Sequence, residues 1–138
     1  MAKTSRYKTG AHTKHRLKYH LTWIPKYRKR VLKGNVASRT EELLSQCAEV
    51  NGWELQELAV MPDHVHLLLQ LGPATSVAQA VQYLKGGSSR IIRAEFPELE
   101  EFLWGDSFWA DGYFAETAGT VSESHIRRYI QEQTSSMP

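Results

Sequence analysis

The chain has 138 residues, of which 41% are hydrophobic and 23% are charged, a globular composition that suits one compact domain but not two. Its apolar runs are far shorter than the roughly 20 residues that a membrane-spanning helix needs, and no signal-type apolar stretch follows the basic N-terminus. We therefore expect a soluble, cytoplasmic protein without a membrane partner.

The net charge of +2 conceals an asymmetry between two parts of the chain. Residues 1–34 contain eleven Lys or Arg and no Asp or Glu, whereas the remainder has six basic and fifteen acidic residues. Basic residues interleaved with Tyr and Trp can neutralise phosphates and stack on bases, although such a segment can also be a solvated tail. The single cysteine, Cys47, excludes an intrachain disulfide and a cysteine-rich zinc site. It falls in a helical pattern, where a small buried residue is ordinary.

The apolar periodicity and the turn residues predict seven elements in the order β-α-β-β-α-β-α. They are a strand over 17–24, a helix over 36–50 after a turn at Gly34–Asn35, strands over 53–61 and 64–71 joined by Pro62–Asp63, a helix from 76 to about 96, a strand over 108–117, and a helix from 120 to about 133. Ser76 fits the start of the second helix, and either Thr120 or Ser122 fits the start of the third. Gly86–Gly87 predicts a kink or a close backbone approach within the second helix.

The first six elements match the split βαβ arrangement of ferredoxin-like and RRM-like domains. We therefore predict an α+β fold, with an antiparallel four-stranded sheet, two helices on one face and a further C-terminal helix. Residues 1–15 are expected to be a flexible basic arm, residues 16–134 a single domain, and residues 135–138 a tail.

Two histidines, His64 and His66, are separated by one residue in a predicted strand. Their imidazoles project from the same face about 7 Å apart, while Val65 and Leu67 point toward the core. The pair is half of a possible metal site, but the spacing alone is more typical of surface histidines that bind nothing. With oxygen ligands added, such a site could hold manganese or magnesium.

Tyr129 and Gln133 lie one turn apart on the last predicted helix. The phenol could attack a phosphodiester while the amide oxygen binds a metal. The same two residues also belong to an ordinary apolar helix face with Ile126 and Ile130, which predicts packing instead. Arg127 and Arg128 beside them could hold phosphates or be solvated.

Five segments, taken together, resemble a known family. The segments are YHLTWIPKYRKRVL (19–32), MPDHVHLLL (61–69), YLKGGSSR (83–90), LWGDSFW (103–109) and ETAGTVSESHIRRYIQEQ (116–133). They closely resemble the single-tyrosine HUH transposases of the insertion sequence 200/605 family, in the same order and spacing. The resemblance extends from about residue 15 to residue 134.

The resemblance implies a role for each matching residue. Tyr129 matches the catalytic tyrosine, and His64, His66 and Gln133 match the metal ligands, so the last helix would be the catalytic helix. The implied reaction is the cutting and rejoining of single-stranded DNA with imperfect hairpins, through a 5′-phosphotyrosine. It would require a divalent metal, Mg²⁺ or Mn²⁺, and no nucleotide cofactor. The resemblance also implies a homodimer with a shared β-sheet, in which Tyr129 of one subunit can serve the histidines of the other.

Two further interpretations remain open from the sequence. A domesticated relative that processes repeated genomic palindromes would keep the same residues, and a non-catalytic nucleic-acid-binding module would need none of the four. Asp63 adjoins the histidine pair, but its predicted role is in the Pro62–Asp63 turn. Seven basic residues are predicted to contact DNA: Arg16, Lys26, Arg28, Lys29, Arg30, Lys85 and Arg90.

Overall fold

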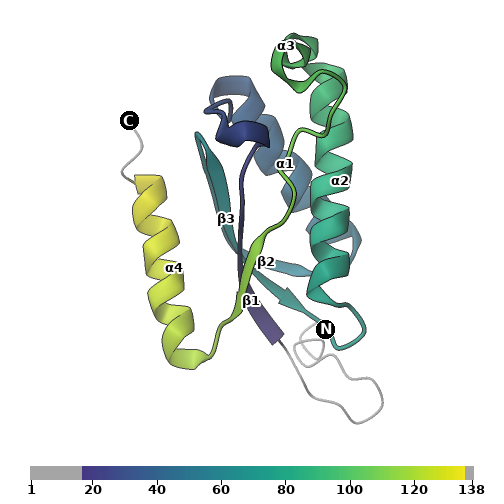
Figure 1. The fold of residues 1–138 in the computed structure, drawn as a ribbon. Coiled ribbons are helices and arrows are strands. Elements are labelled where there is room, and N and C mark those ends of the chain that lie inside the picture. Colours follow the sequence, from purple (N-terminus) through teal and green to yellow (C-terminus); the bar gives the residue numbers. More distant parts are fainter. Residues whose placement is uncertain (1–16, 136–138) are drawn as a thin grey trace.

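The computed structural model describes residues 17–135, so the predicted arm over 1–15, the predicted DNA contact Arg16 and residues 136–138 lie outside the described residues. The main elements, shown in Figure 1, are β1 (Leu17–Trp23), α1 (Gly34–Val50), β2 (Glu54–Met61), β3 (His64–Leu71), α2 (Val77–Glu95), β4 (Phe114–Thr117) and α4 (Thr120–Ser135). Three short helical turns complete the fold: η2 (Lys26–Arg28), η3 (Pro97–Leu99) and α3 (Glu100–Leu103). In the part of the chain covered by these elements, no helix is long and apolar enough to cross a membrane.

The four strands form one antiparallel sheet in the order β2-β3-β1-β4. This order places β1 and β3 at the centre and leaves β2 and β4 at the edges. The split βαβ arrangement requires this order, because each helix crossover skips one strand. The prediction of a ferredoxin-like α+β fold is therefore confirmed.

Alternation along the central strands separates a structural face of the sheet from a functional one. In β1, Leu21 and Trp23 are buried against the helices, and His20 and Thr22 point to the opposite face. In β3, four side chains join the same core: Val65, Leu67, Leu69 and Leu71. The two histidines of β3 lie on the face that carries His20.

Helices cover both faces of the sheet (Figure 1). Helices α1 and α2 pack on one face and enclose the main hydrophobic core. Helix α4 packs on the other face, mainly against β2 and partly against β3. A small second cluster fills that contact: Ala59, Leu68, Ile126 and Ile130. This packing buries β3 on both sides, so that all of its residues except His64 are buried.

Strand β4 is much shorter than the predicted strand over 108–117. The chain makes an isolated bridge between Pro25 and Trp109, in which Lys26 N donates to Phe108 O and Ala110 N donates to Ile24 O. Pairing then stops, because residues 111–113 include Gly112 at a φ of +86°, a left-handed conformation that does not continue a strand. Regular pairing with β1 resumes only at Phe114.

Two glycine predictions also differ from the structure. The expected turn at Gly34–Asn35 is the first turn of α1, with Gly34 at a φ of +55°. Helix α2 is unbroken through Gly86–Gly87, and within the described residues a Cβ placed at either position would meet no atom within 4 Å apart from the neighbouring residues and backbone of the helix itself. The predicted Ser76 cap is confirmed, because its side chain accepts a hydrogen bond from Gln79 N.

Candidate functional site

His64 begins β3 directly after the Pro62–Asp63 turn, as the sequence predicts. Its Nδ1 lies 2.8 Å from Asp63 Oδ1. Since a carboxylate only accepts hydrogen bonds, Nδ1 carries a proton, and in the neutral imidazole Nε2 therefore has the lone pair. That Nε2 is buried and has no hydrogen-bond partner among residues 17–135. His64 therefore presents an unused nitrogen to the site.

His66 is buried at 8% exposure in the middle of the same face. Its Nδ1 lies 3.0 Å from His20 Nε2 and 3.0 Å from Thr22 Oγ1, both on the neighbouring strand β1. Burial, reinforced by the nearby His64 and His20, lowers the pKa of His66 to about 4. The imidazole is therefore neutral near pH 7, as a metal ligand must be.

Tyr129 comes from α4 and meets the histidines from the other side of the site. Its ring packs edge-on against His66 with the centroids 5.2 Å apart, and the His64 ring lies edge-on to His66 at 4.7 Å. Gln133 Nε2 donates to the Tyr129 hydroxyl at 3.1 Å. The four residues singled out in the sequence thus come together, and 47% of the Tyr129 surface stays exposed.

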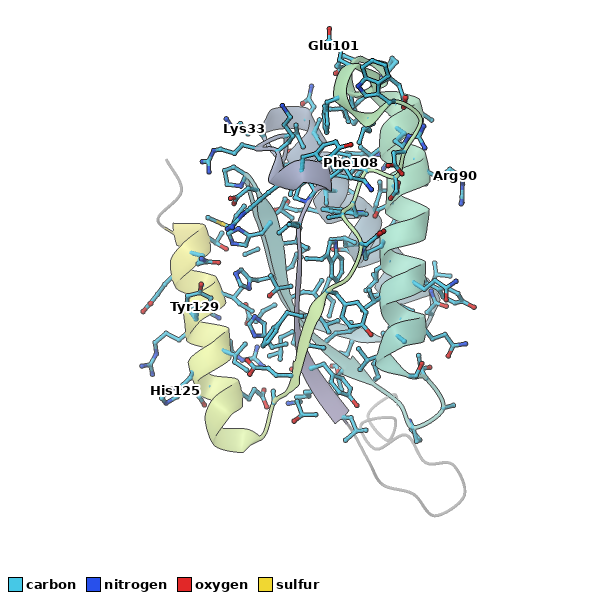
Figure 2. All side chains as sticks on the ribbon, viewed as in Figure 1. Lys33, Arg90, Glu101, Phe108, His125 and Tyr129 are labelled. Carbon is cyan, nitrogen blue, oxygen red and sulfur yellow. The ribbon has the colours of Figure 1, made fainter. Side chains whose placement is uncertain are left out.

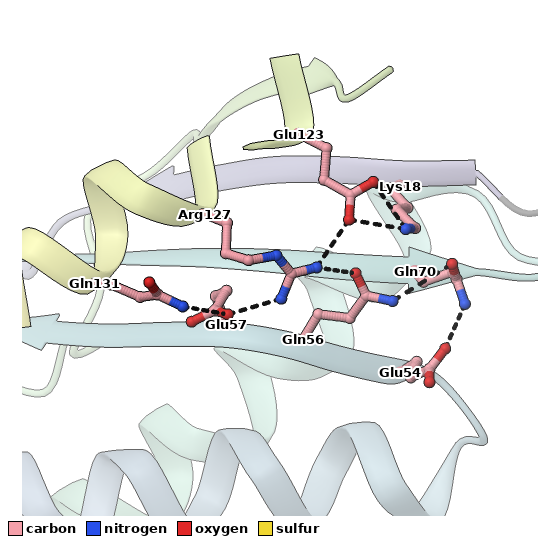
Figure 3. Close-up of polar contacts among 8 residues, drawn as sticks. All are labelled: Lys18, Glu54, Gln56, Glu57, Gln70, Glu123, Arg127 and Gln131. Carbon is pink, nitrogen blue, oxygen red and sulfur yellow. Dashed lines mark hydrogen bonds and ion pairs between the residues drawn. The ribbon is translucent and has the colours of Figure 1, made fainter. Parts of the chain in front are cut away.

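A polar network holds α4 on the sheet beside this site (Figure 3). Arg127 donates to Glu57 at 2.7 Å and to Gln56 at 3.1 Å on β2, and to Glu123 one turn earlier on α4 at 2.8 Å. Glu123 also accepts from Lys18 on β1 at 2.8 Å. We call these residues the α4 clamp: Lys18, Gln56, Glu57, Glu123 and Arg127. The clamp links α4 to two strands just before the turn that carries Tyr129.

Two of the predicted DNA contacts lie next to the histidine pair. Arg28 Nε donates to Asp63 Oδ2 at 3.0 Å, and Arg30 Nη1 lies 3.9 Å from the same oxygen. Burial alone would raise the pKa of Asp63, but the bond from His64 and the nearby Arg28 hold it below its usual range. Tyr27 and Arg28 both have left-handed φ angles, at 59° and 52°, which is uncommon for non-glycine residues.

The other predicted DNA contacts lie away from the histidines. Lys26 pairs with Asp106 at 3.3 Å, and the Lys29 ammonium lies 5.6 Å from the centre of the Phe102 ring. Lys85 donates to Ala110 O and Gly112 O at 2.7 and 2.8 Å. Together with Arg90 it lines a cavity of about 840 Å³ between α2 and residues 107–113. Figure 2 shows Arg90 on α2, across the sheet from Tyr129 on α4.

The donor set of the site fits a divalent metal. His64 offers a buried, unpaired nitrogen, His66 is neutral, and Gln133 adds an amide to the same site. No cluster of three or more His, Cys, Asp or Glu that could hold a metal occurs within residues 17–135. A metal here would therefore depend on two imidazoles and an amide, with water or phosphate oxygens completing the shell.

Sequence reasoning missed three residues of the site. His20 and Thr22 contact His66 from β1, and Glu116 on β4 contacts His20, with its Oε2 3.0 Å from His20 Nδ1. The available signal was the alternation of β1, which places His20 and Thr22 on one face. Periodicity could not predict that His20 and Thr22 contact His66, or that His20 contacts Glu116, because these partners lie 44 to 96 residues apart in the sequence.

Comparison with known proteins agrees with this fold and identifies the family. The sequence profile of the family described as "Transposase IS200 like" matches residues 13–133. The ISDra2 transposase TnpA of Deinococcus radiodurans is 40% identical over 126 residues, which cover 91% of this chain and 90% of that protein. The transposase for insertion sequence element IS200 of Salmonella typhimurium is 32% identical and covers 91% and 82%.

Solved structures show the same fold. A crystal structure of a Deinococcus radiodurans R1 protein named as a transposase superimposes with a TM-score of 0.75 at 39% identity, covering 91% of this chain and 97% of that one. The REP-associated tyrosine transposase bound to a REP hairpin gives a TM-score of 0.66 at 12% identity, covering 85% and 66%. At that identity the second likeness concerns the fold alone.

The ferredoxin-like fold is the fold of the solved transposase structures. The chain belongs to the IS200-like transposase family. This membership assigns it to DNA transposition, with the DNA binding, cleavage and strand transfer that transposition involves.

Proposed function

We propose that this transposase cuts and rejoins single-stranded DNA at transposon ends, with Tyr129 as the nucleophile. The observation that carries the proposal is the contact between Tyr129 and His66, with Gln133 bonded to the Tyr129 hydroxyl. Binding alone requires neither a half-exposed phenol beside a buried histidine nor an imidazole nitrogen without a hydrogen-bond partner. A nucleophile that attacks a phosphodiester requires both an accessible oxygen and a cationic partner.

In the proposed reaction, the Tyr129 oxygen attacks phosphorus and the bond from phosphorus to the 3′ oxygen breaks. The phenolic proton leaves and the departing 3′ oxygen takes up a proton, so the products are a 5′-phosphotyrosine and a free 3′ hydroxyl. One phosphodiester replaces another, so a second 3′ hydroxyl can reverse the step. Strands are therefore rejoined without a nucleotide cofactor.

We further propose that His64, His66 and Gln133 hold Mg²⁺ or Mn²⁺. When bound, the cation supplies positive charge that polarises the phosphodiester. Asp63 and the strand β3 fix the two imidazoles on one face, and Gln133 lies one turn after the nucleophile. Chelation with EDTA should abolish cleavage, and added Mn²⁺ should restore it. Cleavage that persists undiminished in EDTA would contradict the metal assignment.

The test of the nucleophile is a covalent adduct. Wild-type protein is incubated with Mn²⁺ and a labelled, hairpin-bearing single-stranded oligonucleotide, and the products are separated on a denaturing gel. Tyr129→Phe should form no adduct while binding the hairpin nearly as well. Tyr83→Phe is the matched control, because Tyr83 is 48% exposed on α2 and stacks on Trp53 far from the histidines. An adduct formed by the Tyr129→Phe protein would overturn the assignment.

The proposed DNA partner is a single strand with an imperfect hairpin near the transposon end. Arg28 and Arg30 support this partner, because they place two exposed guanidinium groups next to the Asp63–His64 pair. A hairpin oligonucleotide should bind more tightly than a single strand of the same composition that cannot fold. Equal binding of both oligonucleotides would remove hairpin recognition from the proposal.

We also propose a homodimer in which two sheets join at β4. All four residues of β4 are exposed, and β4 is an edge strand. Ala118 N donates to Lys18 O, so the alternation of an antiparallel ladder points the Ala115 N–H away from β1. Ala115→Pro would remove only this outward donor, and light scattering should show monomers. A stable Ala115→Pro dimer would place the interface elsewhere.

The predicted sharing of sites between subunits has its own test. In the single chain Tyr129 lies beside its own His66, yet the short Ala118–Gly119 link is the only connection between β4 and α4. A His64→Ala/His66→Ala protein is mixed with a Tyr129→Phe protein, both inactive alone. Recovery of cleavage supports a shared site, whereas no recovery in verified heterodimers supports catalysis within one chain.

A further inference from the structure

We propose that Glu116 and His20 are positioning residues that fix the proton of His66 on Nδ1, so that its Nε2 lone pair faces the metal site. This inference rests on the proposed role of His66 as a metal ligand. Glu116, His20 and His66 form a continuous chain of hydrogen bonds across three adjacent strands. Glu116 Oε2 lies 3.0 Å from His20 Nδ1, and His20 Nε2 lies 3.0 Å from His66 Nδ1.

The backbone register explains why these side chains meet. Glu116 of β4 is the direct cross-strand partner of His20 of β1, and His66 of β3 is the partner of Thr22, two residues further along β1. All three side chains therefore lie on the α4 face of the sheet. Phe114, two residues before Glu116, packs edge-on against the His20 ring at 6.2 Å and restricts its rotation.

The ring geometry is that of a directed hydrogen bond. The His20 and His66 rings are inclined by only 16°, with their centroids 5.2 Å apart. Two imidazoles joined end to end by an N···N contact of 3.0 Å have roughly this separation, so the rings lie nearly in one plane rather than face to face. The lone pair of one ring nitrogen thus points along the N–H of the other.

The Glu116 carboxylate determines which ring nitrogens of His20 and His66 carry protons. The Glu116 carboxylate can only accept, so His20 carries its proton on Nδ1. In a neutral His20 the Nε2 then has a lone pair and accepts from His66. His66 must therefore donate through Nδ1, which leaves its Nε2 as a lone pair.

Thr22 cannot fix the proton of His66 on Nδ1 in place of Glu116 and His20. Its hydroxyl lies 3.0 Å from His66 Nδ1, but a hydroxyl donates or accepts and so fits either tautomer of His66. Only the Glu116–His20 pair discriminates between the two. His64 has the simpler form of the same arrangement, because the Asp63 carboxylate contacts its Nδ1 directly. One carboxylate thus orients each imidazole, as is common for ligands of protein metal sites.

The test uses the whole chain without metal. Long-range ¹H–¹⁵N spectra of the histidine side chains, recorded in EDTA, identify which ring nitrogen of His66 carries the proton. The wild type should show His66 protonated on Nδ1 only. His20→Phe keeps a ring of similar size without nitrogens, and Glu116→Gln changes a half-exposed side chain that now can donate as well as accept. Each variant should show a mixture of both His66 tautomers.

A second measurement links the tautomer to metal binding. Titration of the protein with Mn²⁺, followed by electron paramagnetic resonance of the free ion, should give a dissociation constant at least about tenfold higher for His20→Phe and a smaller increase for Glu116→Gln. Thr117→Val is the matched control, because Thr117 is the next residue of β4 and its side chain points to the other face. The control should match the wild type in both measurements.

The outcomes separate this inference from the proposed function. A wild-type His66 protonated on Nε2, or a tautomer unchanged in both variants, would overturn the inference whatever the metal does. A wild type that fails to bind Mn²⁺ while showing the expected tautomer would instead count against the metal site. Thermal unfolding of each variant verifies that the comparison is made on folded protein.

Discussion

The two faces of the sheet are stabilised in different ways. On the α1 and α2 face, a continuous core includes fully buried residues such as Leu21, Leu67 and Trp109. On the α4 face, the buried apolar cluster within the described residues consists of only four side chains, and the charged α4 clamp adds polar contacts. The free energy of folding therefore comes mostly from the first face.

The α4 face, which has the smaller apolar cluster, carries all of the residues proposed to act in catalysis. The histidines lie on the rigid central strand β3, whose other side faces the main core, whereas the nucleophile lies on the weakly attached α4. Elements that move tend to have few buried apolar contacts, and charged contacts can exchange partners more readily than an apolar core can repack. This division suits the proposed sharing of Tyr129 between subunits.

The largest expected effect comes from two neighbouring leucines of β3. Leu67 and Leu68 are both fully buried, but Leu67 faces the main core and Leu68 faces α4. Leu67→Ala should lower the free energy of unfolding by about 3–5 kcal/mol, and Leu68→Ala by about 2–3 kcal/mol, because α4 can settle into the gap. Urea denaturation measures both, and a greater loss for Leu68→Ala would contradict the comparison of the two faces.

The pH dependence of stability should also originate on the α4 face. The pKa of His66 is about 4 in the folded chain, against 6.5 for an unperturbed histidine. Between pH 6.5 and pH 4 the imidazole of His66 is protonated in the unfolded chain but stays neutral in the folded chain. The contribution of His66 to the free energy of unfolding is therefore complete above pH 6.5 and is lost as the pH falls from 6.5 to 4. The loss is on the order of 3 kcal/mol at 1.36 kcal/mol per pH unit.

Chemical denaturation in EDTA at pH 7 and pH 4.5 measures this loss. His66→Gln should reduce the difference between the two pH values, because the glutamine does not titrate. His125→Gln removes an exposed histidine of the same region, on α4 (Figure 2), and should keep the wild-type difference. Equal pH dependence in the wild type and in His66→Gln would show that His66 is not the group responsible.

A smaller effect is expected from the α4 clamp. Arg127→Gln removes the cation between Glu57 and Glu123, and the loss should be about 1 kcal/mol because the guanidinium is partly exposed and screened. Hydrogen exchange should show faster exchange of the α4 amides with little change in β3. A double-mutant cycle with Glu57→Gln isolates the Arg127–Glu57 pair, and a coupling near zero would show that the pair does not hold α4.

Local sequence signals were sufficient for most of the fold. The Pro62–Asp63 turn, the alternation around Val65 and Leu67, and the Ser76 cap each depend on neighbouring residues, and the structure confirms them. The start of β4 depends instead on where pairing with β1 resumes after the isolated Pro25–Trp109 bridge and the left-handed Gly112, which no periodicity encodes. The predicted strand over 108–117 was therefore too long.

The candidate site likewise combines features that local sequence predicts with contacts that it does not predict. His64 with His66, and Tyr129 with Gln133, are pairs within one element, so spacing alone placed each pair on one face. Their meeting depends on which face of the sheet α4 covers, and this was available only from the family resemblance. The contact from Glu116 to His20 spans 96 residues and depends on the register between two strands. Such contacts follow from the assembled sheet and not from local sequence.

The smallest expected effect is on the salt dependence of DNA binding, which tests which of the two faces contacts DNA. Arg28 and Arg30 are 65% and 64% exposed beside Asp63 on the active-site face, whereas Lys85 is held by two carbonyl oxygens on the α2 side. Each phosphate neutralised on single-stranded DNA contributes about 0.7 to the slope of log K against log salt concentration. Arg28→Gln and Arg30→Gln should each reduce the slope by about this amount, measured by fluorescence anisotropy with a hairpin oligonucleotide. Lys85→Gln should reduce it less, because its ammonium would have to leave Ala110 and Gly112 to bind a phosphate. A larger change for Lys85→Gln than for Arg28→Gln would direct the DNA along the cavity beside α2 and away from the histidine pair.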